Sequence, residues 1–246
     1  MALLYRGESR KKILRHPIFW MKIAEIVLSL IIFPLCITYN EKGGIYVTNT
    51  TRSLNFTVKY PFQYNNETIV FTGEDNPVGN FNFDPAIEAC VKIFVGVSVV
   101  TCFAAVTTLI VGCVVHRNED KANKVLTAEI FVALLMAFLL VITTSLWLYN
   151  LLELRKEVED EIVSIITSLG RDLCKNCVEF LPSYSALFAS VSLAYISFLI
   201  WLCNTVMVFL ETLHHSAADI TDTGSLVITQ ELTDKSHETE EQTSAT

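Results

Sequence analysis

The sequence alternates between four long apolar runs and shorter polar segments. The apolar runs cover residues 17–39, 89–115, 126–149 and 184–210. About 20 apolar residues cross a bilayer as a helix, and the bilayer core has no water to bond an open backbone, so each run must close its own hydrogen bonds. Buried helices of a soluble protein would carry a polar face, which these runs lack. The pattern therefore predicts an all-α membrane protein with a bundle of four transmembrane helices.

Polar ends flank this membrane domain, which we place at residues 17–213. The first run continues to Tyr39 without a small-residue cleavage site, so we expect an uncleaved signal anchor. Residues 214–246 contain seven acidic residues against one lysine, which predicts a disordered acidic cytoplasmic tail. Residues 1–16 form a basic segment, which favours a cytoplasmic N-terminus. Its basic residues are Arg6, Arg10, Lys11, Lys12 and Arg15.

The first outer loop, residues 40–88, is predicted to be luminal or extracellular. It contains three N-glycosylation sequons, at Asn49, Asn55 and Asn66, whereas the predicted cytoplasmic segments contain none. Both ends of the chain would then face the cytosol. Residues 45–47 and 68–71 are rich in β-branched and aromatic side chains, so a small β-rich loop is expected.

The second outer loop begins with a helical pattern, because apolar residues recur at spacings of three and four and so share one helix face. This stripe either covers a neighbouring element as an extension of the third span or forms an oligomerisation coil, and we favour the first interpretation. Gly170 suits a helix C-terminal cap. The stripe consists of Leu151, Leu154, Val158, Ile162, Ile165 and Leu169.

Cys174 and Cys177 are the only two of the seven cysteines that lie clear of the spans. In an oxidising lumen this pair is expected to form a structural disulfide. Unpaired thiols, a redox centre or half of a zinc site are the alternatives. The last two have little support, because no thioredoxin-like βαβ pattern and no second pair of zinc ligands accompanies the cysteines.

Polar residues inside the spans are functional candidates, because ionisable groups are costly in a bilayer. Lys22 and Glu25 share a helix face, Glu129 lies just inside the third span, and Asn204 lies deep in the fourth. We expect the two glutamates to pair with Lys22 across the helix interface, and Asn204 to bond another helix. An ion or proton path is the alternative.

A row of small residues in the second span predicts close helix packing. The row comprises Gly96, Ala104, Thr108 and Gly112 at a four-residue step that Val100 interrupts. Such a ridge lets two backbones approach. Its partner is either another span of the same chain or a second copy, and the sequence leaves both open.

Composition narrows the functional classes further. The chain is 52% hydrophobic and 18% charged, with a net charge of −8. Phosphate binding needs a basic surface, so we expect no nucleic-acid partner. Nucleophile-elbow, HExxH, P-loop and dinucleotide motifs do not occur in the sequence. We therefore expect a protein that is not an enzyme and has no cofactor or catalytic metal.

Specific strings occur in three spans and in the first loop. They are Trp20-Met21-Lys22-Ile23, Tyr60-Pro61-Phe62, Glu129 with Thr143-Thr144-Ser145-Leu146-Trp147, and Trp201-x-x-Asn204 followed by Phe209-Leu210-Glu211-Thr212. Together they resemble the synaptophysin family of four-span vesicle proteins with a MARVEL-type membrane domain. The resemblance covers about residues 15–213. Family members usually carry a cysteine pair in each luminal loop and a Tyr/Gly/Pro/Gln-rich tail, whereas here only the pair Cys174 and Cys177 is present.

The resemblance implies an integral glycoprotein of synaptic or secretory vesicles, which organises vesicle membrane and SNARE cargo during exocytosis and endocytosis. The implied partners are the vesicle SNARE synaptobrevin, a cholesterol-rich lipid bilayer and further copies of the chain. The alternative is an oligomeric four-span channel or junction protein, in which a ring of Glu129 residues would line the pore.

Overall fold

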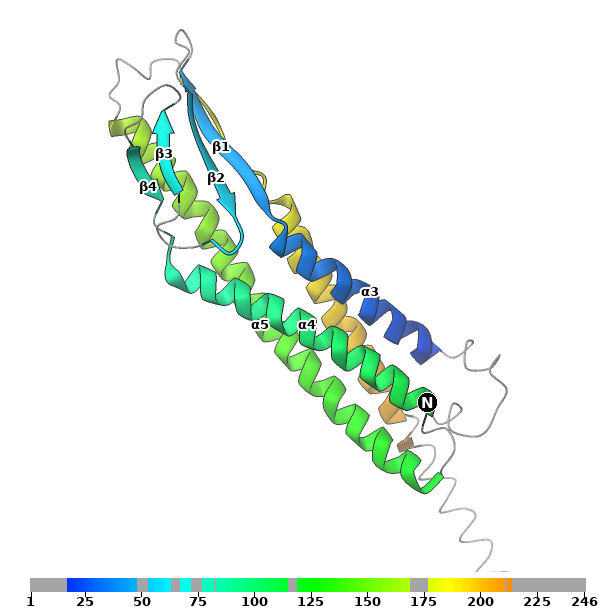
Figure 1. The fold of residues 1–246 in the computed structure, drawn as a ribbon. Helices are drawn as coiled ribbons and strands as arrows, with labels where there is room; N and C mark the ends of the chain where they lie inside the picture. Colours follow the sequence, from blue (N-terminus) through cyan, green and yellow to red (C-terminus); the bar gives the residue numbers. More distant parts are fainter. Residues whose placement is uncertain are drawn as a thin grey trace, which may run out of the picture.

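The computed structural model of the chain describes residues 17–47, 53–62, 67–71, 77–81, 83–114, 119–168, 177–210 and 212–213. This part contains four long helices: α3 (Pro17–Ile37), α4 (Pro85–Val114), α5 (Glu119–Ser168) and a fourth span (Ser185–Leu210). Each is long and apolar enough to cross a membrane. The helices lie side by side in an elongated bundle that carries a β-sheet at one end (Figure 1). The fold is thus mostly helical and multi-pass, as the apolar runs predict.

The two ends of the bundle differ. We call the end with the β-sheet the sheet end, and the end at which α3 begins the opposite end (Figure 1). α5 is 50 residues long, which corresponds to about 75 Å at the rise of an α-helix. The hydrocarbon core of a bilayer is only about 30 Å thick. α5 therefore extends out of the membrane beside the sheet, as the stripe in the second loop predicts.

The sheet has five antiparallel strands in the order β4-β3-β2-β1-β5. Four strands come from the first outer loop and β5 comes from the second, where it pairs with β1. The two outer loops therefore form one sheet. The strands are β1 (Asn40–Val47), β2 (Ser53–Lys59), β3 (Glu67–Phe71), β4 (Pro77–Phe81) and β5 (Cys177–Phe180).

β1 and β3 contain the two segments that the sequence predicts to be extended, whereas β2, β4 and β5 were not predicted. β5 shows that the second outer loop is not helical throughout, because α5 ends at Ser168 and a strand follows. A four-residue strand has too short a pattern to be recognised without its partner strand.

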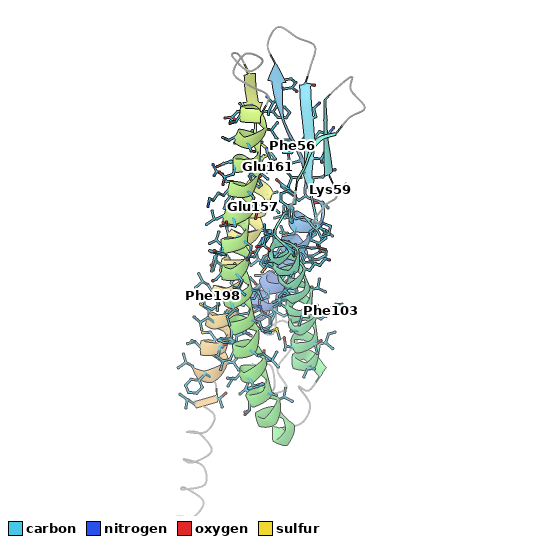
Figure 2. All side chains as sticks on the ribbon, turned by 90° about the vertical axis from the view of Figure 1, so that its left-hand side faces the viewer. Phe56, Lys59, Phe103, Glu157, Glu161 and Phe198 are labelled. Carbon is cyan, nitrogen blue, oxygen red and sulfur yellow. The ribbon has the colours of Figure 1, made fainter. Side chains whose placement is uncertain are left out.

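The apolar stripe of α5 packs against the inner face of the sheet. Leu151, Leu154, Val158, Ile162 and Ile165 are at most 5% exposed and share one buried cluster with Ile45, Phe56 and Val58 of the sheet. Figure 2 shows Phe56 beside α5. The stripe is thus the cover of a neighbouring element that we favoured over an oligomerisation coil. Leu169 and Gly170 lie outside the described residues, as do residues 1–16 and the tail from residue 214.

Gly43 allows this packing on the sheet side. It lies opposite Phe56 in the antiparallel pair of β1 and β2. A Cβ atom on residue 43 would lie 2.4 Å from Cζ of Phe56 and 2.9 Å from Cδ of Pro182. Only glycine leaves room for the Phe56 ring to lie across the strand and reach the α5 stripe.

Candidate functional site

Lys22 lies at the centre of a fully buried charged layer in the membrane-spanning part of the bundle. Its ammonium nitrogen is 3.2 Å from a carboxylate oxygen of Glu25 on the next turn of α3. It is 3.7 Å from a carboxylate oxygen of Glu129 on α5. Lys22 and Glu25 have no exposed surface, and Glu129 is 5% exposed. The helix faces expected to meet therefore do meet, and they join the first and third spans through one lysine.

The fourth span contributes Trp201 to this layer. The ammonium nitrogen of Lys22 lies 4.3 Å from the centre of the Trp201 ring. A cation over an indole face is attracted by the ring quadrupole, and the attraction grows when both groups are removed from water. Trp201 has no exposed surface. Sequence reasoning used Trp201 only as part of the resemblance, although its place three residues before Asn204 already puts both side chains on one helix face.

Asn204 is also fully buried, on the same face of the fourth span. Among the described residues, neither its amide nitrogen nor its amide oxygen has a hydrogen-bond partner, and the same holds for Nε1 of Trp201 and Oγ of Ser197. The interhelical hydrogen bond expected for Asn204 is therefore not formed with another described residue. Buried polar atoms of this kind are uncommon, and each calls for a specific explanation.

Apolar residues close the charged layer on both sides along the bundle axis. Ile18, Leu126 and Val208 form a small buried cluster one turn nearer the opposite end. Toward the sheet end lies a second cluster that includes Ala133, Ala137 and Leu140. The layer is thus enclosed by apolar contacts, which lower the local dielectric and strengthen the ion pairs within it.

Weaker polar contacts continue along the bundle toward the sheet end. Ser29 Oγ lies 3.4 Å from Thr101 Oγ1, which links α3 to α4. Cys36 donates to Ser190 Oγ over 3.3 Å and links α3 to the fourth span. These contacts are separated by apolar residues such as Ile32, so they fix helix pairing and do not form a continuous polar path.

The small residues of α4 do not act as one ridge within the chain. Gly96 faces outward, and an added Cβ atom there would have no neighbour within 4 Å. Ala104 is half-buried against the cluster around Ala105, Thr108 bonds the carbonyl of its own helix at Ala105, and Gly112 is buried. Thr101 is the buried small residue of α4 whose side chain meets α3, at Ser29. It lies outside the four-residue row, because helix faces recur at steps of three and four and not four alone.

The sequons and the cysteine pair are described only in part. Asn55 lies exposed on β2, and its side chain contacts Ser53 Oγ at 3.4 Å. Asn49 and Asn66 lie outside the described residues. Cys174 lies outside them as well, and of Cys177 only the backbone is described, in β5 opposite Val47. The expected disulfide stays a prediction.

A column of aromatic rings connects the sheet to the spans. Phe62 of the first loop stacks on Trp147 of α5 at 6.0 Å, and Trp147 stacks on Phe94 of α4 at 6.3 Å. Phe62 has a backbone φ of 61°, which is costly for a residue with a Cβ atom, and its 1% exposed ring offsets that cost through packing. The stacked rings therefore join the five-stranded sheet to the membrane-spanning part of the bundle.

Glu157 is a partly exposed acidic residue on the part of α5 that lies beside the sheet. On α5 it accepts a hydrogen bond from the backbone nitrogen of Asp84 over 3.4 Å, and this contact joins α5 to the segment before α4. Partial burial raises the pKa of Glu157 above its usual value, and the bond from Asp84 offsets part of that rise. Figure 2 shows Glu157 and Glu161 one turn apart on α5, level with the sheet.

Comparison with known proteins assigns neither a family nor a function to this site. No model of a known protein family matches the chain, and no curated protein matches it. Among the described residues, no three His, Cys, Asp or Glu side chains lie close enough together to hold a metal ion. The charged layer around Lys22 is therefore the candidate site that the structure offers.

Proposed function

We propose that the chain is a non-enzymatic membrane protein of synaptic or secretory vesicles, which organises vesicle membrane and the vesicle SNARE synaptobrevin. It would belong to the synaptophysin family and have a MARVEL-type membrane domain, with both termini in the cytosol. Cholesterol-rich lipid and further copies of the chain would be additional partners.

The observation that carries the proposal is that the strings that resemble this family meet in space. Lys22, Glu129 and Trp201 come from three different strings and form one contact group. Phe62 and Trp147 come from two strings and stack on each other. Because the strings lie far apart in the sequence, their contacts indicate that these residues pack as one unit, and this supports a shared membrane fold more strongly than the separate strings do.

The surface of the bundle fits a protein that works within the membrane plane. Large apolar side chains cover its outside, including Phe103, Phe131 and Phe138, each more than 60% exposed. Figure 2 shows Phe103 on the outer side of α4. In a bilayer these side chains contact lipid or the transmembrane helix of a partner. The buried charges hold the four helices in one arrangement and so define the shape of that surface.

The channel alternative receives no support from Glu129. Its side chain lies inside the bundle of its own chain, 3.7 Å from Lys22, and is 5% exposed. A pore between copies would need Glu129 on the outer surface. We therefore keep the vesicle-organising function as the single proposal.

The test exchanges the charges of the buried pair and compares the result with an exposed pair. The double variant Lys22→Glu with Glu25→Lys places an acid opposite Glu129 and removes the cation from Trp201. The control is Glu88→Lys with Lys92→Glu, which inverts an ion pair on α4 between a partly exposed glutamate and an exposed lysine. A tagged full-length chain is imaged against vesicle, endosomal and plasma-membrane markers, and synaptobrevin is measured in the purified complex.

We expect the wild type and the control to reach vesicles and to retain synaptobrevin, and we expect the buried exchange to lose both. Wild-type protein that is absent from vesicles, or that never retains synaptobrevin, contradicts the proposed function. Unchanged sorting of the buried exchange variant contradicts the role given to Lys22.

A further inference from the structure

A cavity lies beside α5, where the spans meet the sheet end of the bundle. It has a volume of about 290 Å³, and its walls come from α5, from the segment after β5 and from the start of the fourth span. Ligand pockets usually have about 300–1,000 Å³, so this cavity fits a small group and not a whole lipid. The residues that line it include Arg155, Glu159, Leu181, Tyr184, Ser185 and Phe188.

The cavity lies at the level where the spans leave the hydrocarbon core. α3 ends at Ile37, and the fourth span begins at Ser185. Tyr39, just after α3, stacks on Tyr184 with ring centres 6.3 Å apart, which puts the ends of these two spans at one level. A layer of lipid headgroups covers each side of the hydrocarbon core. Headgroups of the surrounding bilayer are therefore the groups that meet this cavity.

Two charged side chains of α5 lie in the cavity wall in a defined order along the bundle. Nε of Arg155 donates a hydrogen bond to a carboxylate oxygen of Glu159 over 2.7 Å. Glu159 lies one turn farther toward the sheet end than Arg155, because α5 runs in that direction (Figure 1). The two side chains are 53% and 39% exposed, so both can contact a ligand. The bond uses one of the five N–H donors of the guanidinium group, and the two terminal nitrogens of that group suit a phosphate.

Two aromatic side chains line the cavity from the other side. Tyr184 and Phe188 lie one helical turn apart at the start of the fourth span. Burial raises the pKa of Tyr184, Glu159 raises it further and Arg155 lowers it, so the hydroxyl group lies close to both charges. Tyr184 is 8% exposed, and its hydroxyl group has no hydrogen-bond partner among the described residues. Because buried hydroxyl groups usually have a partner, this one points to a polar ligand in the cavity.

The charge of this region favours a zwitterionic ligand over an anionic one. Residues 153–161 of α5 include five acidic and two basic side chains, and this excess of negative charge repels an anion. The pair of Arg155 and Glu159 is itself neutral. A ligand with one negative and one positive group matches such a pair, because each of its charges meets the opposite charge.

We propose that the cavity binds the phosphocholine headgroup of a bilayer lipid. In such a lipid the phosphate is joined to the part embedded in the membrane, and the quaternary ammonium group projects outward. The phosphate then meets Arg155, and the ammonium group meets Glu159 and the rings of Tyr184 and Phe188. The charges of the headgroup thus follow the same order as those along α5. The inference goes beyond the proposed function and needs only a chain that spans a bilayer, which the four apolar helices fit.

Native mass spectrometry of the full-length protein in maltoside detergent tests this binding, because it resolves each bound lipid by its mass. Phosphatidylcholine and phosphatidylethanolamine with the same acyl chains are offered together, and they differ only in the methyl groups on the ammonium nitrogen. We expect the wild type to retain more phosphatidylcholine. Equal retention of the two lipids overturns the proposal, and so does displacement of phosphatidylcholine by an equal amount of cholesterol.

The decisive variant exchanges the two charges in the cavity wall, Arg155→Glu with Glu159→Arg. It keeps the net charge and an ion pair at the same spacing, but it places an acid beside the phosphate. Phosphatidylcholine should bind at least about tenfold more weakly, which corresponds to the loss of one hydrogen bond to a charged group. The control is Glu88→Lys with Lys92→Glu, which exchanges an ion pair at the same spacing on α4 and should leave binding unchanged. Unchanged binding in the first variant, or an equal loss in both, overturns the proposal.

The aromatic contact has its own matched pair of variants. Phe188→Leu removes a ring from the cavity but keeps an apolar side chain. Phe198→Leu is the control, because Phe198 is also partly buried on the fourth span but lies nearer the opposite end (Figure 2). The first variant should reduce the preference for phosphatidylcholine over phosphatidylethanolamine severalfold, and the second should not change it. An unchanged preference in Phe188→Leu overturns the proposed contact of the ring with the ammonium group.

Soluble phosphocholine tests whether the headgroup belongs to a lipid. It has no acyl chains to contact the apolar surface of the spans, so it should displace phosphatidylcholine only in large excess. Displacement at equal concentration overturns the assignment of the cavity to a bilayer lipid.

Discussion

The packing of the α5 stripe against the sheet makes a quantitative prediction for Val158. This side chain has no exposed surface and belongs to the cluster that joins α5 to Ile45 and Phe56. Val163 lies on the same helix, also beyond the membrane, and is 58% exposed. The substitution of each valine by alanine therefore makes the same chemical change in a buried and an exposed position.

The magnitude follows from the atoms removed. Val158→Ala deletes two buried carbon atoms, which costs about 1.6 kcal/mol at about 0.8 kcal/mol for each, and the cavity left behind adds to this cost. Alanine has a higher helix propensity than valine, which returns roughly 0.5 kcal/mol. The free energy of unfolding should therefore fall by about 1–2 kcal/mol in Val158→Ala. For Val163→Ala only the gain in helix propensity remains, so the stability of this variant should equal or slightly exceed that of the wild type.

Hydrogen–deuterium exchange of the amides in β1 and β2 measures this effect locally, because these strands are held in place by the stripe. A loss of about 1–2 kcal/mol should accelerate exchange roughly 5- to 30-fold in Val158→Ala. Val163→Ala should leave exchange unchanged. Equal protection of β1 and β2 in the two variants would refute the reasoning, because the sheet would then be stable without the α5 stripe.

Three further predictions use single substitutions. Gly43→Ala should destabilise the five-stranded sheet by about 1–3 kcal/mol through overpacking against Phe56, whereas Gly96→Ala should cause no loss of stability. Thermal unfolding of the two variants checks this difference. Asn55→Gln should remove one glycan if β2 faces the lumen. The variant should then migrate faster than the wild type on a gel, and glycosidase treatment of both proteins should abolish this difference. Because its pKa is raised in the folded state, Glu157 lowers stability as the pH rises through that pKa. Glu157→Gln should therefore raise the melting temperature at pH 7 and lose this advantage in a melting series taken below about pH 4.

Several features of the candidate site were predictable because they depend on local spacing. Lys22 and Glu25 are three residues apart, and this alone places them on one helix face. The depth of Glu129 and Asn204 in their spans restricts the levels at which they can meet. Local spacing does not reveal which helices are neighbours, so the contact of Lys22 with Trp201 needed the tertiary structure. The small-residue row shows the same limit, because Gly96 fits the pattern yet faces outward.

The sequence by itself determined the four spans, the extension of α5 and the β-rich character of the first outer loop. These features depend on hydrophobic length and periodicity, which are properties of a single segment. Only the tertiary structure decided that β5 joins the sheet of the first loop, that Phe62 and Trp147 connect that sheet to the bundle, and that one lysine faces two carboxylates. Each of these is a contact between segments far apart in the chain, and its energy depends on a partner that no local pattern contains.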